Sequence, residues 1–241
     1  MNAAELRSDP GMPLAVVRLG SVPYQQAFEL QQQLATIRQA GRGRDALLLL
    51  EHPAVYTFGK RTDPANILLS DDQLAARGIE LVPVDRGGDV TYHGPGQLVG
   101  YPILRLASVR GVVDYVRSLE EVLIRTLATY GVTGERSHGF TGVWVGEEKI
   151  AAIGVRVASQ AVTSHGFALN VTTDLDDFAG IVPCGITDRG VCSLASLGVD
   201  TEVDEVADRV ERAVAEVFGA TLEPTRLGDL LPDELRSKVT S

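Results

Sequence analysis

The segment from Arg86 to Leu106 constrains the fold of this 241-residue chain most, because glycines recur within it among strand-forming residues. Five glycines lie between positions 87 and 100, with Val90, Tyr92 and Val99 among the residues between them. A glycine lets another strand or a ligand approach the backbone closely. The pattern therefore predicts either a run of bulges and tight turns or a groove, bare of side chains, that accepts an extended apolar chain.

The hydrophobic pattern elsewhere predicts an α+β fold. Strands are expected at 14–19, 46–50 and 79–84, a β-hairpin at 143–157 and a further antiparallel strand at 161–171. Helices are expected at 23–40 with Ser21 as the cap, at 70–77, at 112–130 and at 203–218. Hairpins outnumber strand–helix–strand units, which disfavours a doubly wound parallel fold. We predict a flexible tail over 1–13 and a single domain over 14–241, built on a largely antiparallel mixed sheet flanked by helices.

Composition narrows the class of protein. The formal net charge is −10, and 15 of the 32 acidic residues follow Val171, so a nucleic-acid partner is not expected. Apolar runs such as Ala46–Leu50 are far shorter than the roughly 20 residues of a membrane span. Two cysteines make no disulfide framework, and residues 1–13 have no signal-peptide pattern. We therefore expect a cytoplasmic protein that binds neither nucleic acid nor membrane.

A few residues carry possible chemistry. Cys184 lies between a proline and a glycine, on a turn that can present a nucleophile, whereas Cys192 has no comparable turn and is interpreted as a packing residue. Lys149 begins the second strand of the hairpin before an apolar stretch, where a lysine pKa shifts readily. On spacing alone, a buried inert cysteine and a solvated lysine remain the simpler readings. His93 lies in a turn, and the other histidines are scattered along the sequence, so no metal site is predicted.

Four separated motifs resemble the octanoyltransferase family of lipoate synthesis. They are Arg86–Pro102 (RGGDVTYHGPGQLVGYP), the pair Gly142–Val145 (GVWV) and Lys149–Gly154 (KIAAIG), His165–Val171 (HGFALNV), and Pro183–Ile186 (PCGI). Together with 50–59 they cover about residues 45 to 197. One departure is visible, since the chain has Gly190-Val191-Cys192 where the family usually has Gly-Val-Thr before a serine or threonine.

The resemblance implies a fold shared with biotin- and lipoate-protein ligases and no cofactor. It implies an octanoyl transfer from octanoyl-acyl carrier protein to a lysine of lipoyl domains, in 2-oxoacid dehydrogenase E2 subunits and the glycine cleavage H protein. Cys184 is then the acyl-thioester nucleophile and Lys149 its activator. The substrate-binding residues that it implies are Arg86, Gly87, Gly88, Asp89, Val90, Thr91, Tyr92, His93, Ala152, Ile153, Gly154, Gly166, Phe167 and Ala168.

Two alternatives stay open on the sequence. An ATP-dependent lipoate- or biotin-protein ligase would use the same fold without a nucleophilic cysteine. A non-catalytic protein that binds acyl carrier protein or lipoyl domains would keep the groove with an inert Cys184. If the carrier docks as expected, a locally basic face is needed for this acidic partner, and its expected sources are Arg42, Arg44, Lys60, Arg61 and Arg86.

Overall fold

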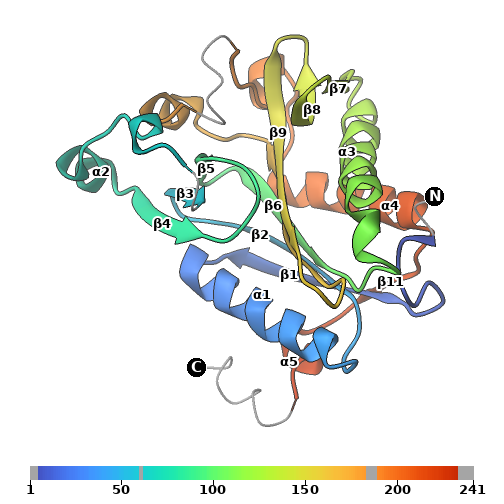
Figure 1. Ribbon diagram of the computed structural model, residues 1–241. Coiled ribbons are helices and arrows are strands. Elements are labelled where there is room, and N and C mark those ends of the chain that lie inside the picture. The colour runs from blue at the N-terminus through green and yellow to red at the C-terminus, as the bar shows by residue number, and fades with distance from the viewer. Residues whose placement is uncertain (1–4, 60–61, 183–188, 233–241) are drawn as a thin grey trace.

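A large mixed sheet organises the computed structural model, which describes residues 5–59, 62–182 and 189–232 (Figure 1). In these residues eight strands follow the order β11-β1-β2-β6-β10-β9-β8-β7. Their bounds are β1 Leu14–Ser21, β2 Ala46–Glu51, β6 Gln97–Ile103, β7 Glu135–Ser137, β8 Phe140–Val145, β9 Glu148–Val157, β10 Thr163–Asn170 and β11 Leu222–Pro224. Only the β11–β1 and β1–β2 pairs are parallel, so the largely antiparallel sheet that the sequence predicts is confirmed.

Helices cover both faces of this sheet. Helix α1 (Tyr24–Gln39) packs on one face, where Ala27, Leu30 and Leu34 meet apolar residues of β1, β2 and β6. Helices α3 (Val112–Ala128) and α4 (Val203–Phe218) cover the other face and bury Leu119, Leu123 and their apolar neighbours. A short helix α5 (Leu227–Leu230) follows β11. No helix among the described residues is long and apolar enough to cross a membrane.

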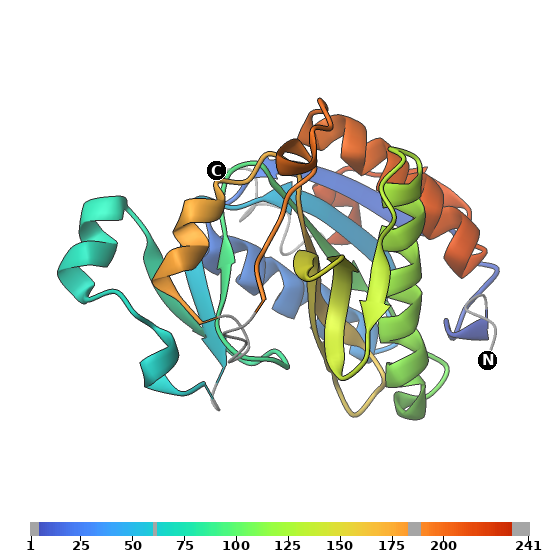
Figure 2. The same ribbon diagram turned by 90° about the horizontal axis from the view of Figure 1, so that it is seen from above.

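A second, smaller sheet lies beside the first one (Figure 2). It contains β4 (Glu80–Val84), β3 (Val55–Gly59) and β5 (Thr91–His93), with α2 (Asp71–Arg77) preceding β4. The sequence predicted the strand at 79–84 but placed no strand at 55–59, so the separate sheet was not expected. Because β5 leads through one turn into β6, the glycine-rich segment joins the two sheets.

Local signals explain several element boundaries. Helix α2 begins with a capping box, in which Ser70 accepts from the Gln73 N–H, and ends at Gly78 in the left-handed conformation, φ +65°. The expected Ser21 cap of α1 is wrong, because Ser21 is the last residue of β1 and Pro23 occupies the N-cap position without a side-chain bond.

The segment before β1 is a further correction. Residues 5–13 belong to the folded unit, whereas the sequence predicted a flexible tail over 1–13. Leu6 and Arg7 are buried, and the Arg7 guanidinium pairs with the fully buried carboxylate of Asp45 at 2.8 Å. A second guanidinium, that of Arg38, also pairs with Asp45 at 2.8 Å. Arg7 and Asp45 are 38 positions apart in the sequence, so local composition gives no sign of their contact.

Candidate functional site

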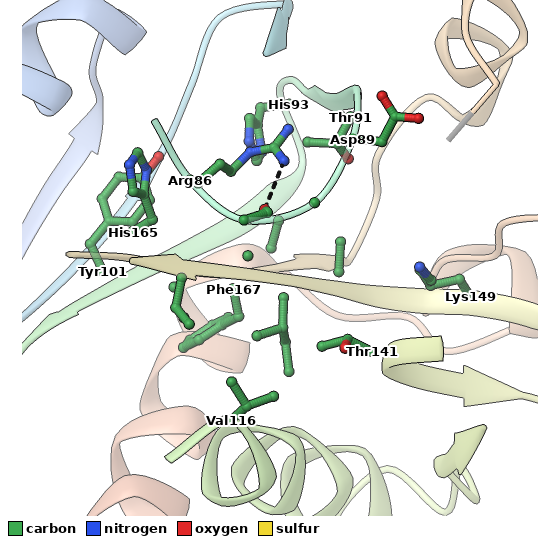
Figure 3. Close-up of a pocket in the computed structure, with 18 of the residues that line it drawn as sticks. Arg86, Asp89, Thr91, His93, Tyr101, Val116, Thr141, Lys149, His165 and Phe167 are labelled. Carbon is green, nitrogen blue, oxygen red and sulfur yellow. Dashed lines mark hydrogen bonds between the residues drawn. The ribbon is translucent and has the colours of Figure 1, made fainter. Parts of the chain in front are cut away.

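A cavity of about 440 Å³ lies between β9, β10, the loop that begins at Arg86 and the start of α3 (Figure 3). Its size is typical of pockets that hold a small organic group. Most residues that the resemblance singled out line it: Arg86, Gly87, Gly88, Asp89, Thr91, His93, Lys149, Ala152, Ile153, Gly154, Gly166, Phe167 and Ala168. The sequence missed further lining residues: Tyr24, Tyr101, Val116, Gly139, Phe140, Thr141, Val155 and His165.

Two of the expected residues do not line this cavity. Val90 and Tyr92 are buried in the apolar cluster under the small sheet, where the Tyr92 hydroxyl donates to the Asp177 carboxylate at 2.8 Å. Strand alternation explains the difference, because Thr91 and His93 point to the opposite side of β5 from Val90 and Tyr92. Their part in substrate binding remains a prediction.

Small residues form the part of the cavity wall that β9 and β10 provide. Ala152 lies opposite Ala168, and Gly154 lies opposite Gly166, in the antiparallel register. A side chain at Gly154 would not enter open space, since its Cβ would lie 2.9 Å from the Gly87 carbonyl oxygen. The loop is held at that distance because the Gly87 N–H donates to the Val155 carbonyl at 3.2 Å.

The other glycines of the segment serve the chain's own packing. A Cβ at Gly100 would lie 2.1 Å from the Phe167 ring, and one at Gly96 would lie 2.7 Å from the Thr172 backbone. At Gly94 the space is taken by the Tyr92 ring. The expectation of a groove along the whole segment is therefore wrong at these three positions. Gly94 and Gly96 lie in the turn between β5 and β6, whereas Gly100 lies within β6 and accommodates the Phe167 ring.

Arg86 forms the wall of the cavity on the side of the small sheet. Its guanidinium donates to the Thr57 carbonyl at 2.8 Å and to the Thr57 hydroxyl at 2.9 Å. Asp89, in the same loop, accepts from the Asn66 amide at 2.6 Å. The small sheet and the segment that precedes α2 therefore hold this loop against β9.

The fold brings together two histidines that are 41 positions apart in the sequence, His52 and His93. The rings of His52 and His93 lie 5.6 Å apart, and the Tyr24 ring stacks on His93 at 5.9 Å. His52 donates from Nδ1 to the Val22 carbonyl, since that oxygen can only accept, and Nε2 then accepts from the Tyr101 hydroxyl at 2.7 Å. Burial lowers the pKa of His52 to about 4, so it is neutral at physiological pH.

A chain of amides assigns the tautomer of His93. Asn170 donates from Nδ2 to the Cys192 carbonyl at 2.9 Å, so its oxygen is free to accept from Gln97 Nε2, also at 2.9 Å. The Gln97 oxygen must then accept from Nδ1 of His93 at 2.7 Å. Burial, followed by the nearby His52, holds the pKa of His93 well below its usual value. His93 is therefore neutral, with a lone pair on Nε2.

His165 has a strained backbone at the cavity. Its φ is +58°, a left-handed conformation that residues with a side chain rarely adopt. The strain breaks the alternation of β10, so His165 stacks on Phe28 of α1 at 5.7 Å while Phe167 packs with the residues of α3 and α4. Two bonds hold it: the His165 N–H donates to Gln31 at 2.7 Å, and the ring pairs with Asp85 at 2.9 Å.

Lys149 lies at the opposite end of the cavity from His165 and Tyr101 (Figure 3). Its ammonium nitrogen is 4.8 Å from the centre of the Trp144 ring. The backbone of Lys149 pairs with the segment that follows Arg189. The Lys149 N–H donates to the Gly190 carbonyl at 3.0 Å, and the Cys192 N–H donates to the Lys149 carbonyl at 3.1 Å.

Cys184, the expected nucleophile, lies outside the described residues. The described residues on either side of residues 183–188 are attached to the cavity wall. Val182 donates to the carbonyl of Asn66, whose amide is bonded to Asp89, and Gly190 is bonded to Lys149. The chain therefore leaves and re-enters the described structure beside residues that line the cavity.

Cys192 behaves as the sequence predicted. It is 1% exposed and belongs to the main apolar core. Burial, followed by the charge of Glu148, raises the pKa of the Cys192 thiol to about 12. A thiol in that environment is a poor nucleophile near neutral pH.

The described residues provide no metal site, and they place only part of the expected basic face. Among residues 5–59, 62–182 and 189–232, no three histidine, cysteine or carboxylate side chains are placed to hold a metal ion. Arg44, an expected source of basic charge, pairs with Glu223 at 2.5 Å. Lys60 and Arg61 lie outside the described residues, so the basic face remains a prediction.

Known proteins resemble the chain over most of its length. The family described as the lipoyl protein ligase A/B catalytic domain matches residues 23–215. An octanoyltransferase of Acidobacterium capsulatum is 51% identical over 240 residues, which covers 92% of this chain and 97% of that protein. An octanoyltransferase of Solibacter usitatus is 54% identical over 208 residues, with 86% and 94% covered.

Solved structures match the architecture at lower identity. A putative lipoate protein ligase from T. acidophilum superposes with a TM-score of 0.75 at 18% identity, covering 95% of this chain and 94% of that one. Lipoate-protein ligase A bound with ATP gives a TM-score of 0.75 at 19% identity, with 94% and 95% covered. These matches confirm the predicted α+β fold.

Proposed function

The chain belongs to the octanoyltransferases of the lipoyl protein ligase A/B family, and on that premise we propose that it transfers octanoyl groups through a thioester on Cys184. The donor is octanoyl-acyl carrier protein, and the acceptor is a lysine of a lipoyl domain. The observation that carries the proposal is the cavity, which has Lys149 at one end and small residues along β9 and β10.

Two observations on the described residues support Cys184 as the nucleophile. The other thiol, Cys192, is buried, and its pKa is raised to about 12. The described residues that flank residues 183–188 are bonded at the cavity wall: Val182 to Asn66, which bonds to Asp89, and Gly190 to Lys149. These bonds of the flanking residues, together with the burial of Cys192, support the proposal that Cys184 is the nucleophile.

Lys149 supplies the opposing charge. At about 4 Å, an ammonium and a thiolate attract by roughly 4 kcal/mol at an effective dielectric of about 20. That interaction lowers the thiol pKa from its ordinary value of about 8.5. The half-buried position of Lys149 limits the water that would otherwise screen the pair.

The reaction then runs in two balanced steps. The Cys184 thiolate attacks the donor carbonyl, a carbon–sulfur bond forms, and the carrier thiolate leaves with the proton of the Lys149 ammonium. The acceptor's neutral amine next attacks the enzyme thioester, the amide bond forms, and the carbon–sulfur bond to Cys184 breaks. Neutral Lys149 takes the amine proton, which restores the ion pair.

The octanoyl chain lies along the small residues of β9 and β10. From Lys149 to Ala152 is three strand residues, or about 10 Å at roughly 3.3 Å per residue, a length similar to that of an extended eight-carbon chain. Arg86–Asp89, Thr91 and His93 close the cavity on one side, and Ile153 and Phe167 supply apolar surface.

Intact mass tests the proposal and separates it from the two alternatives. Incubation with octanoyl carrier protein, without ATP, is expected to add one octanoyl group, and Cys184→Ser should abolish the adduct while Cys192→Ser keeps it. An adduct or transfer that requires ATP would indicate a ligase, and no adduct under either condition would indicate a binding protein. Loss of the adduct only in Cys192→Ser would refute the assignment of Cys184.

Lys149 is tested by separating the two steps. Lys149→Arg keeps the charge but does not give up a proton near neutral pH, so it should form the thioester and transfer it poorly. Lys149→Ala should fail in both steps. Transfer by Lys149→Arg at the wild-type rate would show that another group takes the amine proton.

The natural acceptors and the compartment remain proposals. Lipoyl domains of 2-oxoacid dehydrogenase E2 subunits and the glycine cleavage H protein are the expected acceptors, and the cytoplasm is the expected compartment. Transfer assays with each isolated acceptor domain compare them directly.

A further inference from the structure

Trp144 lies under the charged groups at one end of the cavity. It is the cross-strand partner of Lys149 in the β8–β9 hairpin, and it is 2% exposed. The Lys149 ammonium is 4.8 Å from its ring centre, and the Arg189 guanidinium carbon is 5.1 Å away. Its indole N–H has no hydrogen-bond partner among the described residues, so its described polar contacts are these cation–π contacts.

Arg189 is the first described residue after the Cys184 segment, and its side chain is held by several groups. The guanidinium lies 4.9 Å from the Phe140 ring centre and donates to the Ser137 hydroxyl at 2.9 Å. It also pairs with Glu147, in the hairpin turn, at 3.4 Å. One indole ring therefore contacts both the lysine and the residue that ends the Cys184 segment.

Gly142 provides the other support for the lysine. A Cβ at this position would lie 3.5 Å from Cε and 3.6 Å from Cδ of Lys149, so the lysine stem runs close over the backbone. The Gly142 N–H donates to the carboxylate of Glu120, which is fully buried, at 3.3 Å. The stem of Lys149 is thus confined near Gly142 and its ammonium near Trp144.

We propose that Trp144 is a positioning residue, whose ring fixes the place of the Lys149 ammonium at the end of the cavity and of the Arg189 guanidinium beside it. The proposal rests on the proposed function, in which Lys149 and Cys184 form the reacting pair. A cation–π contact away from water changes an equilibrium by a factor of roughly 2 to 30. Loss of the contact should therefore slow the chemistry of the pair by about tenfold without abolishing it.

The sequence offers a direct test, because Trp144 is the single tryptophan of the chain. Replacing tryptophan with fluorinated tryptophan during expression changes this one ring and nearly preserves its shape. Fluorine withdraws electron density from the ring face and weakens its attraction for cations. The single-turnover acylation rate at saturating octanoyl carrier protein should fall stepwise from no fluorine to one, two and four.

A second readout follows the thiol itself. The rate of Cys184 alkylation by iodoacetamide, followed by peptide mass, has a pH midpoint that should rise as fluorine is added. Trp144→Phe should retain more of the acylation rate than Trp144→Leu. A matched control is Tyr130→Leu. It removes a ring that lies 3.8 Å from the Arg209 guanidinium of α4, just after the end of α3 and away from the cavity, so both readouts should stay unchanged.

Either readout can overturn the proposal. An acylation rate, or an alkylation midpoint, that does not change with fluorine content would show that the ring only fills space. If unlabelled protein forms no octanoyl adduct on Cys184, the proposed function fails first. If it forms the adduct and fluorine has no effect, only the role of Trp144 is refuted.

Discussion

Ala152→Val should shorten the acyl chain that the enzyme prefers. Ala152 is half-buried, lines the cavity and lies opposite Ala168 in the β9–β10 register. Valine is well tolerated in strands, so the backbone should keep its path. Position 154 is a poorer choice, because a side chain there would displace the Arg86–Gly88 loop instead of filling the cavity.

The size of the effect follows from the volume added. Valine brings two more methyl groups, which take the space of about two methylenes of the substrate. Each buried methylene contributes roughly 0.8 kcal/mol, so the octanoyl chain loses about 1.6 kcal/mol, or about 15-fold in kcat/KM. A hexanoyl chain ends before the added methyls and should keep its kcat/KM.

The assay is the ratio of kcat/KM for octanoyl and hexanoyl carrier protein. Ala152→Ser is the matched control, since it changes polarity with little change in volume and should keep the wild-type length preference. An unchanged octanoyl-to-hexanoyl ratio in Ala152→Val, with the wild-type melting temperature retained, would show that the acyl chain does not run past Ala152.

Three further predictions concern stability and docking. Asp45→Asn removes the negative charge with which the buried Arg7 and Arg38 pair. It should lower the free energy of unfolding by about 3–5 kcal/mol and Tm by roughly 10 °C or more in calorimetry. Arg44→Gln, the control in a more exposed pair, should change Tm little, and equal Tm shifts in the two variants would contradict the reasoning. The pKa of His52 is lowered to about 4 by burial, so its contribution is complete above pH 6.5 and is lost as the pH falls toward 4, by as much as about 3 kcal/mol. Urea unfolding at several pH values should show this slope, and His52→Gln should flatten it; an equal slope in the variant would refute the assignment. The apparent KM for octanoyl carrier protein should rise as the Debye length falls from about 10 to 3 Å between 0.1 and 1 M salt, and a constant KM would argue against a basic docking face.

The sequence by itself determined the elements whose signals are local. Strand β2 and the β8–β9 hairpin follow from apolar runs and a turn, and α4 follows from valines at helical spacing. The end of α2 at Gly78 follows from the left-handed conformation that glycine permits. Such signals depend on backbone periods and on conformations that extend over a few residues, so they survive without knowledge of the neighbours.

Most residues of the cavity wall could also be predicted from the sequence, but only through its resemblance to a family. Thirteen of the residues implied in this way line the cavity, whereas Val90 and Tyr92 do not. Resemblance selects whole motifs, and a strand motif includes side chains of both faces. Only the pairing of β5 within the small sheet decides which of them reach the cavity.

Tertiary structure alone decided the contacts between distant segments. Tyr24, His52 and His93 are in contact although they are far apart in the sequence. The space that a side chain at Gly100 would need is occupied by the Phe167 ring and not by a ligand. The left-handed backbone of His165 is held by Gln31, which lies 134 residues earlier. These outcomes depend on the register of strands and on which helix covers which face. Local periodicity leaves both open, because it sets the side of an element on which a residue lies but not the neighbour that it meets there.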